Sequence, residues 1–160
     1  MKSENSRIQQ LLQNSWDGNM WHGTNLKEIL AGIDAEKAFR KPAAGSHNIY
    51  ELVMHMHCWR NFVCEHLNGN VDFNVELNSV LDWPVNYVAT EAGWINALAL
   101  LEKSQSELME RFAKFEEDQL DRSMHGRKFS WYDFLHGMIH HDIYHSAQIA
   151  ILKKQEFYLP

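Results

Sequence analysis

The sequence predicts an all-α protein, a four-helix bundle with one short extra helix. Apolar residues recur at helical spacing in four long stretches, at residues 4–17, 48–68, 88–115 and 130–154. No alternating apolar run is long enough to require a sheet. The chain has 160 residues, 45% of them apolar, which is enough for one buried core. We therefore expect residues 1–160 to form a single domain.

Composition and charge narrow the choice of partner and compartment. The net charge is −6 with histidines neutral, and the basic residues are not clustered, which argues against nucleic acid or an anionic membrane as the main partner. No stretch reaches the roughly 20 apolar residues that span a bilayer, and the N-terminus lacks a signal peptide's apolar run. Cys58 and Cys64 face different directions of one predicted helix, so we expect free thiols and a soluble, cytoplasmic protein.

The N-terminal part is expected to contain one long helix, one short helix and a connector. Residues 4–17 are amphipathic and end at an Asp-Gly-Asn turn. A short helix follows at residues 26–31, with Thr24 as its N-cap. Residues 34–46 are predicted to be a connector, because Pro42 prevents a continuous helix there.

Two of the long helices have recognisable start signals. Asn48 is followed three residues later by Glu51, and Ser130 is followed three residues later by Asp133. Both pairs are typical of capping boxes, in which each residue satisfies a backbone N–H group near the other. We therefore expect helices to begin directly after Asn48 and Ser130.

A helical wheel separates the histidines of the second long helix, residues 48–68. His55 falls on the inward apolar face, whereas His57 and Arg60 lie around the other side, and His57 is expected to face solvent. His66 shares the inward face, but it lies about 16 Å further along the helix axis. Of these histidines, only His55 is therefore placed to share an inward site with another helix.

A long connection, residues 70–86, joins the second and third long helices and contains Asp82, Trp83 and Pro84. A connection of this length can cross the end of a bundle, so the two helices need not be antiparallel neighbours. We expect Trp83 to plug a bundle end, and the alternative is that it lines the mouth of a pocket.

Four of the ten histidines lie in the last helix, residues 130–154, as two pairs spaced four residues apart. Rings with this spacing share a helical face. His141 and His145 fall on an apolar face expected to turn to the core, and His136 and His140 fall on the opposite side. Polar rings in apolar surroundings need partners, either a divalent metal ion or hydrogen bonds to side chains or water.

The last helix is apolar nearly all round, so its second face also needs cover. Ile143, Ala147, Ala150 and Ile151 make up that face. It predicts either a homodimer contact or packing against the N-terminal helix, and the pattern does not choose between them.

The sharpest hypothesis is a metal site made of His55, His141 and His145. Three histidines plus an open position are typical of a catalytic divalent site, where the ion lowers the pKa of a water or thiol. Glu51 and Gln148 each lie about one turn from a histidine and could orient a ligand or the bound water.

The remaining polar residues are expected to have other roles. Asp142 should contact a neighbouring helix or another side chain rather than the metal, and Tyr144 should serve packing. His22, beside Trp21 in a loop, is the best candidate outside the trio for a substrate contact. The other histidines are expected at the surface or in local hydrogen bonds.

Two helical segments resemble the signatures of the DinB/YfiT-like superfamily. One runs from Ile49 to His55 and is followed by Trp59, and the other runs from His141 to Ile149. Three loop matches appear in the expected order: Trp21-His-Gly, Lys41-Pro42 and Asp82-Trp-Pro84. Ser146-Ala147 departs from the pattern, because many members have a small residue followed by glycine there.

The resemblance implies an up-down-down-up four-helix bundle, often a homodimer, with a metal held by His55, His141 and His145. Characterised relatives include thiol transferases that use a low-molecular-weight thiol, and a thiol-dependent isomerase. We therefore expect a metal-dependent enzyme, with zinc or nickel as cofactor, that transfers a thiol to a small molecule or hydrolyses one. The alternative is a non-catalytic metal-binding or stress-related bundle protein, since fold and ligand set do not choose a reaction.

Overall fold

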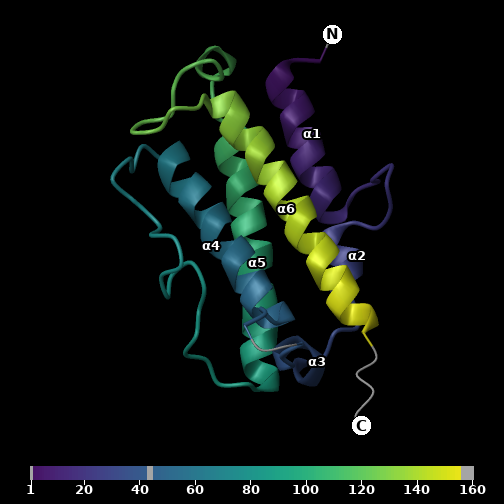
Figure 1. Ribbon diagram of the computed structural model, residues 1–160. Coiled ribbons are helices and arrows are strands. Elements are labelled where there is room, and N and C mark those ends of the chain that lie inside the picture. The colour runs from purple at the N-terminus through teal and green to yellow at the C-terminus, as the bar shows by residue number, and fades with distance from the viewer. Residues whose placement is uncertain (1, 43–44, 156–160) are drawn as a thin grey trace.

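The protein is built of helices packed side by side, as a computed structural model shows for residues 2–42 and 45–155 (Figure 1). The helices are α1 (Glu4–Asp17), α2 (Leu26–Leu30), α3 (Ala35–Phe39), α4 (Ile49–Leu67), α5 (Glu91–Phe112) and α6 (Trp131–Lys154), with a 3-10 turn at Glu117–Gln119. The described residues form no strand beyond two isolated bridges. The all-α prediction is therefore confirmed.

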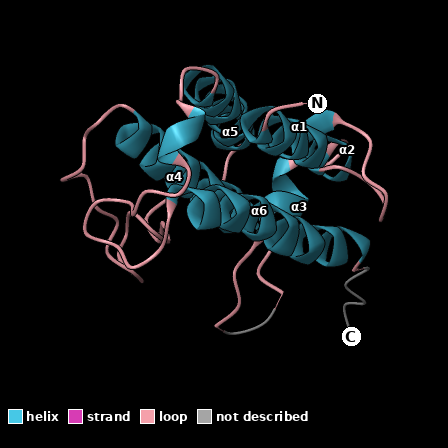
Figure 2. Cartoon of the chain, turned by 90° about the horizontal axis from the view of Figure 1, so that it is seen from above, coloured by secondary structure: helices cyan, strands magenta, loops and turns pink. Residues whose placement is uncertain are grey.

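The four long helices follow the up-down-down-up path (Figure 1). α1 and α6 run in one direction, and α4 and α5 run in the other. The segment between α4 and α5 returns along the length of the bundle, so these two helices are parallel. Seen from above, α1 and α5 form one layer, and α4 and α6 form the second (Figure 2). Because α4 and α6 are neighbours in the second layer, histidines on their facing sides lie close together.

Both expected capping boxes are present. The Asn48 side chain accepts from the Glu51 N–H group and the Glu51 carboxylate accepts from that of Asn48; Ser130 and Asp133 make the same exchange. Such a cap contributes about 1 kcal/mol to helix stability. Because each cap depends only on residues three apart, the starts of α4 and α6 follow from local sequence.

The shorter helices depart from expectation. α2 is capped by Asn25 rather than Thr24, because Asn25 forms a capping box with Glu28. The segment predicted as a connector, residues 34–46, contains α3, which begins after Asp34 caps the N–H of Lys37. The bundle thus carries two short helices, since Pro42 interrupts the chain only after α3 has ended. Residues 43 and 44 of that connector lie outside the described residues.

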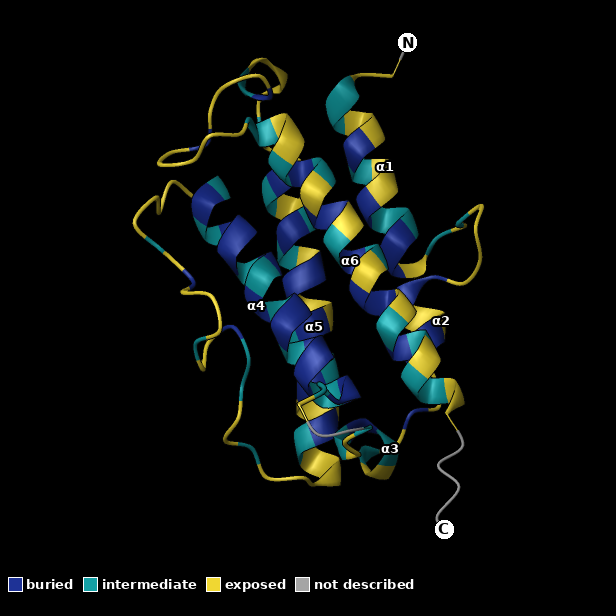
Figure 3. Ribbon diagram, in the orientation of Figure 1, coloured by how far each residue is buried: buried dark blue, intermediate teal, exposed yellow. Residues whose placement is uncertain are grey.

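α4 is buried over most of its length, whereas α6 alternates buried and exposed residues (Figure 3). Arg60 lies away from the apolar face that the wheel selected, yet its side chain is fully buried, because it reaches both Leu101 of α5 and Asp142 of α6. His57 is half-buried rather than exposed, and burial lowers its pKa. Sequence periodicity could not reveal this, since it records one apolar face and not the helices on both sides.

A buried ion pair joins α4 to α6. Arg60 donates from Nη2 and Nε to Oδ2 of Asp142, at 2.7 and 3.2 Å, and its guanidinium lies 5.1 Å from the ring of Trp16. Burial raises the pKa of Asp142, but the Arg60 charge outweighs it, so the pKa is lower than usual. The expectation that Asp142 contacts a neighbouring helix is confirmed.

The second face of α6 is covered only in part. Ile143 packs with the core residues around Ile8, and Ala150 packs with those around Leu26, so α1 and α2 provide this cover. Ile151 remains 61% exposed. Packing against α1, one of the two alternatives, accounts for part of the face, and the homodimer remains a prediction.

No helix in the described part of the chain has the length and apolar character needed to cross a membrane.

Candidate metal centre

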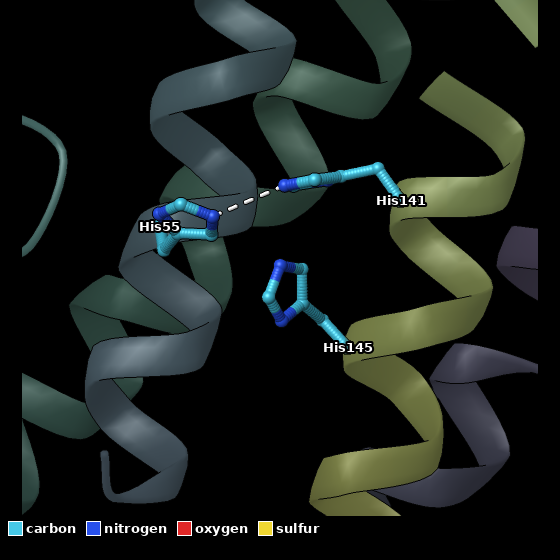
Figure 4. A group of neighbouring side chains, drawn as sticks. All are labelled: His55, His141 and His145. Carbon is cyan, nitrogen blue, oxygen red and sulfur yellow. Dashed lines mark hydrogen bonds between the residues drawn. The ribbon is translucent and has the colours of Figure 1, made fainter. Parts of the chain in front are cut away.

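Three histidine rings from two helices converge between α4 and α6 (Figure 4). His55 comes from α4, and His141 and His145 come from successive turns of α6. One nitrogen of each ring lies within 4.8 Å of the other two, and Nε2 of His55 lies 3.1 Å from Nε2 of His141. His55 and His145 are buried, and His141 is half-buried. These are the same three histidines that the helical wheels selected.

The ring of His55 is oriented by Asp82, which follows α4 in the long connection. His55 Nδ1 lies 3.0 Å from the Asp82 carbonyl oxygen and 2.9 Å from its Oδ1. Asp82 is 2% exposed, and it also accepts from Trp59 Nε1 and the Asn78 N–H group. A proton on Nδ1 leaves the lone pair on Nε2, which points to the trio.

Gln148 does the same for His145. Its Oε1 lies 2.7 Å from His145 Nδ1, so this nitrogen donates and Nε2 is left as an acceptor. Gln148, which the sequence suggested as a residue that could orient a ligand, therefore contacts one of the three histidines.

His141 has a different arrangement behind its ring. Its Nδ1 and Oδ1 of Asp142 are both buried without a hydrogen-bond partner, and they lie 3.9 Å apart. A movement of about 1 Å would bring them to hydrogen-bond distance. Arg60 holds the other carboxylate oxygen, so Asp142 is fixed behind the ring. The neutral tautomer of His141 that carries its hydrogen on Nδ1 would satisfy both orphan atoms and direct the lone pair of Nε2 to the centre.

The protonation states of His55 and His145 suit a cation. Burial and then the neighbouring His141 lower the pKa of His55, and the same causes lower the pKa of His145 to about 4. Both rings are therefore neutral at pH 7, the state in which imidazole binds a metal. Tetrahedral nitrogen ligands about 2.1 Å from zinc lie about 3.4 Å apart, close to the 3.1 Å between His55 and His141 Nε2.

Glu51 does not support the trio, so the expectation that it could orient a ligand there is wrong. Both of its carboxylate oxygens lie 2.6 Å from Lys41 Nζ, and Oε1 also accepts from Tyr87 Oη at 2.7 Å. His47 Nδ1 lies 3.1 Å from Oε2. Burial raises the pKa of Glu51, but the hydrogen bonds from Lys41, Tyr87 and His47 outweigh it and lower the pKa.

Trp83 packs directly against the candidate centre. Its ring stacks between His55 and His47, with centroid distances of 3.8 and 3.6 Å. It also lines two surface cavities, of about 450 and about 570 Å³. Of the two expectations for Trp83, lining a pocket is the one that the structure supports.

Two cavities flank the trio along the α4–α6 groove. The cavity of about 570 Å³ lies beside His145 and is also lined by Gln148 and Tyr144. The second, about 310 Å³, lies beside His141. Tyr144 is 62% exposed and borders the first cavity, so the expectation that it serves packing is wrong. Periodicity missed this because the side of α6 that carries Tyr144 has no helix over it.

The remaining candidates lie away from the trio. His22 lines a separate cavity of about 230 Å³ with Ile143 and Ala147, on the other face of α6, so the loop does not bring it to the trio. Cys58 and Cys64 are free, as expected, and both are buried. Burial raises the pKa of each thiol to about 11, so neither is suited to act as a thiolate.

Comparison with known proteins adds a family. The model of the DinB superfamily matches residues 21–149, a range that includes all three histidines. No curated protein matches the chain, and no solved structure matches it. The family match covers most of the chain and agrees with the all-helical fold and with the clustered histidines of α4 and α6. The chain therefore belongs to the DinB superfamily.

Proposed function

We propose that this protein binds one divalent metal ion, zinc or nickel, through Nε2 of His55, His141 and His145, and uses it to transfer a thiol to a small molecule or to hydrolyse one. The observation that carries the proposal is the convergence of three imidazole nitrogens within 4.8 Å of one another. Imidazole suits both metals, and three such ligands leave a position for a reactant.

The chain's own residues would prepare the site for this ion. Asp82 and Gln148 hold the rings of His55 and His145 by their Nδ1 atoms, which leaves each Nε2 free to bind. When bound, the ion would supply Lewis acidity and lower the pKa of a water or thiol beside it. Trp83, stacked on His55, excludes water from that side of the ring.

The surroundings favour a small-molecule reactant. Cavities of about 570 and about 310 Å³ lie on the two sides of the trio, in the size range of small-molecule sites.

We further propose a homodimer that uses the exposed part of the α6 face around Ile151, and a cytoplasmic location. Light scattering at micromolar concentration tests the dimer, and a monomer would contradict it.

Metal analysis tests the site. Protein purified without a nickel column should contain about one zinc or nickel per chain, and His55→Ala, His141→Ala and His145→Ala should each lose it. His57→Ala is the matched control on α4, because His57 lies two residues from His55 but turns to α5. Full metal content in all three site variants would refute the assignment.

Turnover distinguishes an enzyme from a non-catalytic metal protein. Low-molecular-weight thiols are paired with electrophiles, and esters are tested separately for hydrolysis. Activity that disappears with a chelator and returns with the metal supports the proposal. Stoichiometric metal without turnover on any pair would favour the non-catalytic alternative.

A further inference from the structure

The cavity beside His141 is almost wholly apolar. Its lining residues are Trp59, Val63, Phe129, Phe134, Gly137 and Met138, together with Asp133 and His141. Of the two polar residues, Asp133 accepts through Oδ2 from the N–H and hydroxyl groups of Ser130, and Nε2 of His141 turns to His55. The walls therefore offer a ligand apolar contact and little hydrogen bonding.

Aromatic rings form much of this wall. Trp59 donates its Nε1 to Asp82, so its ring carbons are left to border the cavity. Phe129 stacks on Phe134 with a centroid distance of 5.7 Å and an interplanar angle of 17°. Phe129 nevertheless remains 39% exposed. An aromatic ligand could bury this surface and gain offset or edge-on ring contacts.

The opposite side of the trio is chemically different. The cavity beside His145 includes Ser46, His47, Gln148 and Gln155 among its lining residues. The trio thus divides one groove between α4 and α6 into a mixed polar half and an apolar half. A reactant bound at the centre would therefore meet different surroundings on its two sides.

We propose that the apolar cavity binds an aryl arm of the substrate, whose reacting atom lies at the His55–His141–His145 centre. This specificity rests on the proposed function, and it adds the class of substrate: a small electrophile or ester that carries an aromatic group. A cavity of about 150 Å³ lined by apolar side chains is known to hold benzene, so about 310 Å³ accommodates a substituted ring. His141 is both a wall of the cavity and a member of the trio, which places the arm next to the reaction centre.

Gly137 offers a way to fill the cavity without disturbing the trio. It lies on the cavity wall one turn before His141, and a Cβ atom built there meets no atom within 4 Å. Gly137→Leu therefore starts in open space and adds apolar volume at the cavity. Gly137→Ala is the matched control, because it makes the same backbone change in α6 with one carbon only.

The test is a binding titration of 4-fluorobenzyl alcohol, followed by ¹⁹F NMR, on the full chain with and without zinc. We expect saturable binding to both forms, and 2-fluoroethanol, which lacks the ring, should bind much more weakly. Gly137→Leu should weaken aryl binding by about tenfold or more, and Gly137→Ala by no more than about threefold. His140→Leu, which adds the same side chain on the exposed face of α6, should leave binding unchanged.

A second variant covers the case in which the leucine introduced by Gly137→Leu turns to solvent. Phe129→Ala removes one half-exposed wall, and it should also weaken binding severalfold. The proposal is overturned if the wild-type protein does not bind the aryl probe, or if both variants bind it as the wild type does. Because binding is measured without metal too, aryl binding by a protein that takes up neither added zinc nor added nickel would refute the proposed function alone. Zinc binding without aryl binding would refute this inference alone.

Discussion

Two histidine pairs on α6 have the same spacing but different surroundings. His141 and His145 face α4, and their ring centroids lie 4.4 Å apart, with His55 completing a group of three. His136 and His140 lie 6.4 Å apart; His136 packs on Tyr132 and His140 is exposed. Among the described residues, only the first pair belongs to a cluster able to hold a metal ion.

The comparison shows that helical spacing places two histidines on one face, whereas the fold adds the third histidine and the residues that orient the rings. Within residues 2–42 and 45–155, the second pair gains no third ligand from another helix. The first pair gains His55, and the trio gains partners that orient its rings, Asp82 for His55 and Gln148 for His145. A motif of two histidines four residues apart is therefore weak by itself, and its value depends on what the neighbouring helix presents.

The largest expected effect separates the two pairs directly. Zinc should raise the thermal midpoint of the wild-type protein, because an ion that binds only the folded state at about 1,000 times its Kd stabilises it by about 4 kcal/mol. The double variant His141→Ala/His145→Ala should lose this rise, and His136→Ala/His140→Ala should keep it. Calorimetry with and without zinc measures both. An equal loss in the two variants would remove the distinction between the pairs.

The next effect concerns the ion pair behind His141, which His136 and His140 do not have. Arg60→Met leaves the buried Asp142 carboxylate without its partner, so it should destabilise the fold by about 3–5 kcal/mol. Urea unfolding measures the loss. Arg60→Met/Asp142→Leu removes both charges and should recover most of the stability. A single variant as stable as the wild type would mean that the pair contributes little.

A smaller effect is expected at the ring partner of His55. Asp82→Ala removes the acceptor Oδ1 but keeps the backbone carbonyl oxygen beside His55 Nδ1, so the ring is held less firmly and metal affinity should weaken by about 10–100-fold. Asp72→Ala is the matched control in the same connection, because Asp72 is exposed. Competition with a chromogenic chelator gives both affinities. Equal affinities would show that Asp82 does not tune the site.

The smallest effect lies outside both pairs, at Glu51. Its pKa is lower in the folded protein than the ordinary value of 4.5, so the ionised form stabilises the fold above pH 4.5, and this contribution is lost as pH falls through the folded pKa. Glu51→Gln should therefore cost about 1 kcal/mol at pH 7, and the difference from wild type should shrink below pH 4.5. Urea unfolding between about pH 3 and pH 7 measures it. Metal content should not change, because Glu51 contacts Lys41, Tyr87 and His47 instead of the trio.

Much of the candidate site could be predicted because it depends on interactions between residues that lie close together in the sequence. The starts of α4 and α6 follow from Asn48 and Ser130, whose caps involve residues three positions away. The wheels of these helices then selected the inward rings, and the contact of Gln148 with His145 also stays within one turn. Hydrogen bonding along a helix and its 3.6-residue period are properties of neighbouring residues.

The tertiary structure alone decided the contacts that cross between elements. Arg60 is buried because helices pack on both sides of α4, and Asp82 and Trp83 reach His55 because the connection after α4 runs back along the bundle. Glu51 turns to Lys41 and Tyr87, which are distant in sequence or in other elements. The path of a long connection and the partner of a buried charge depend on how all the elements pack together, so helical periodicity does not predict them.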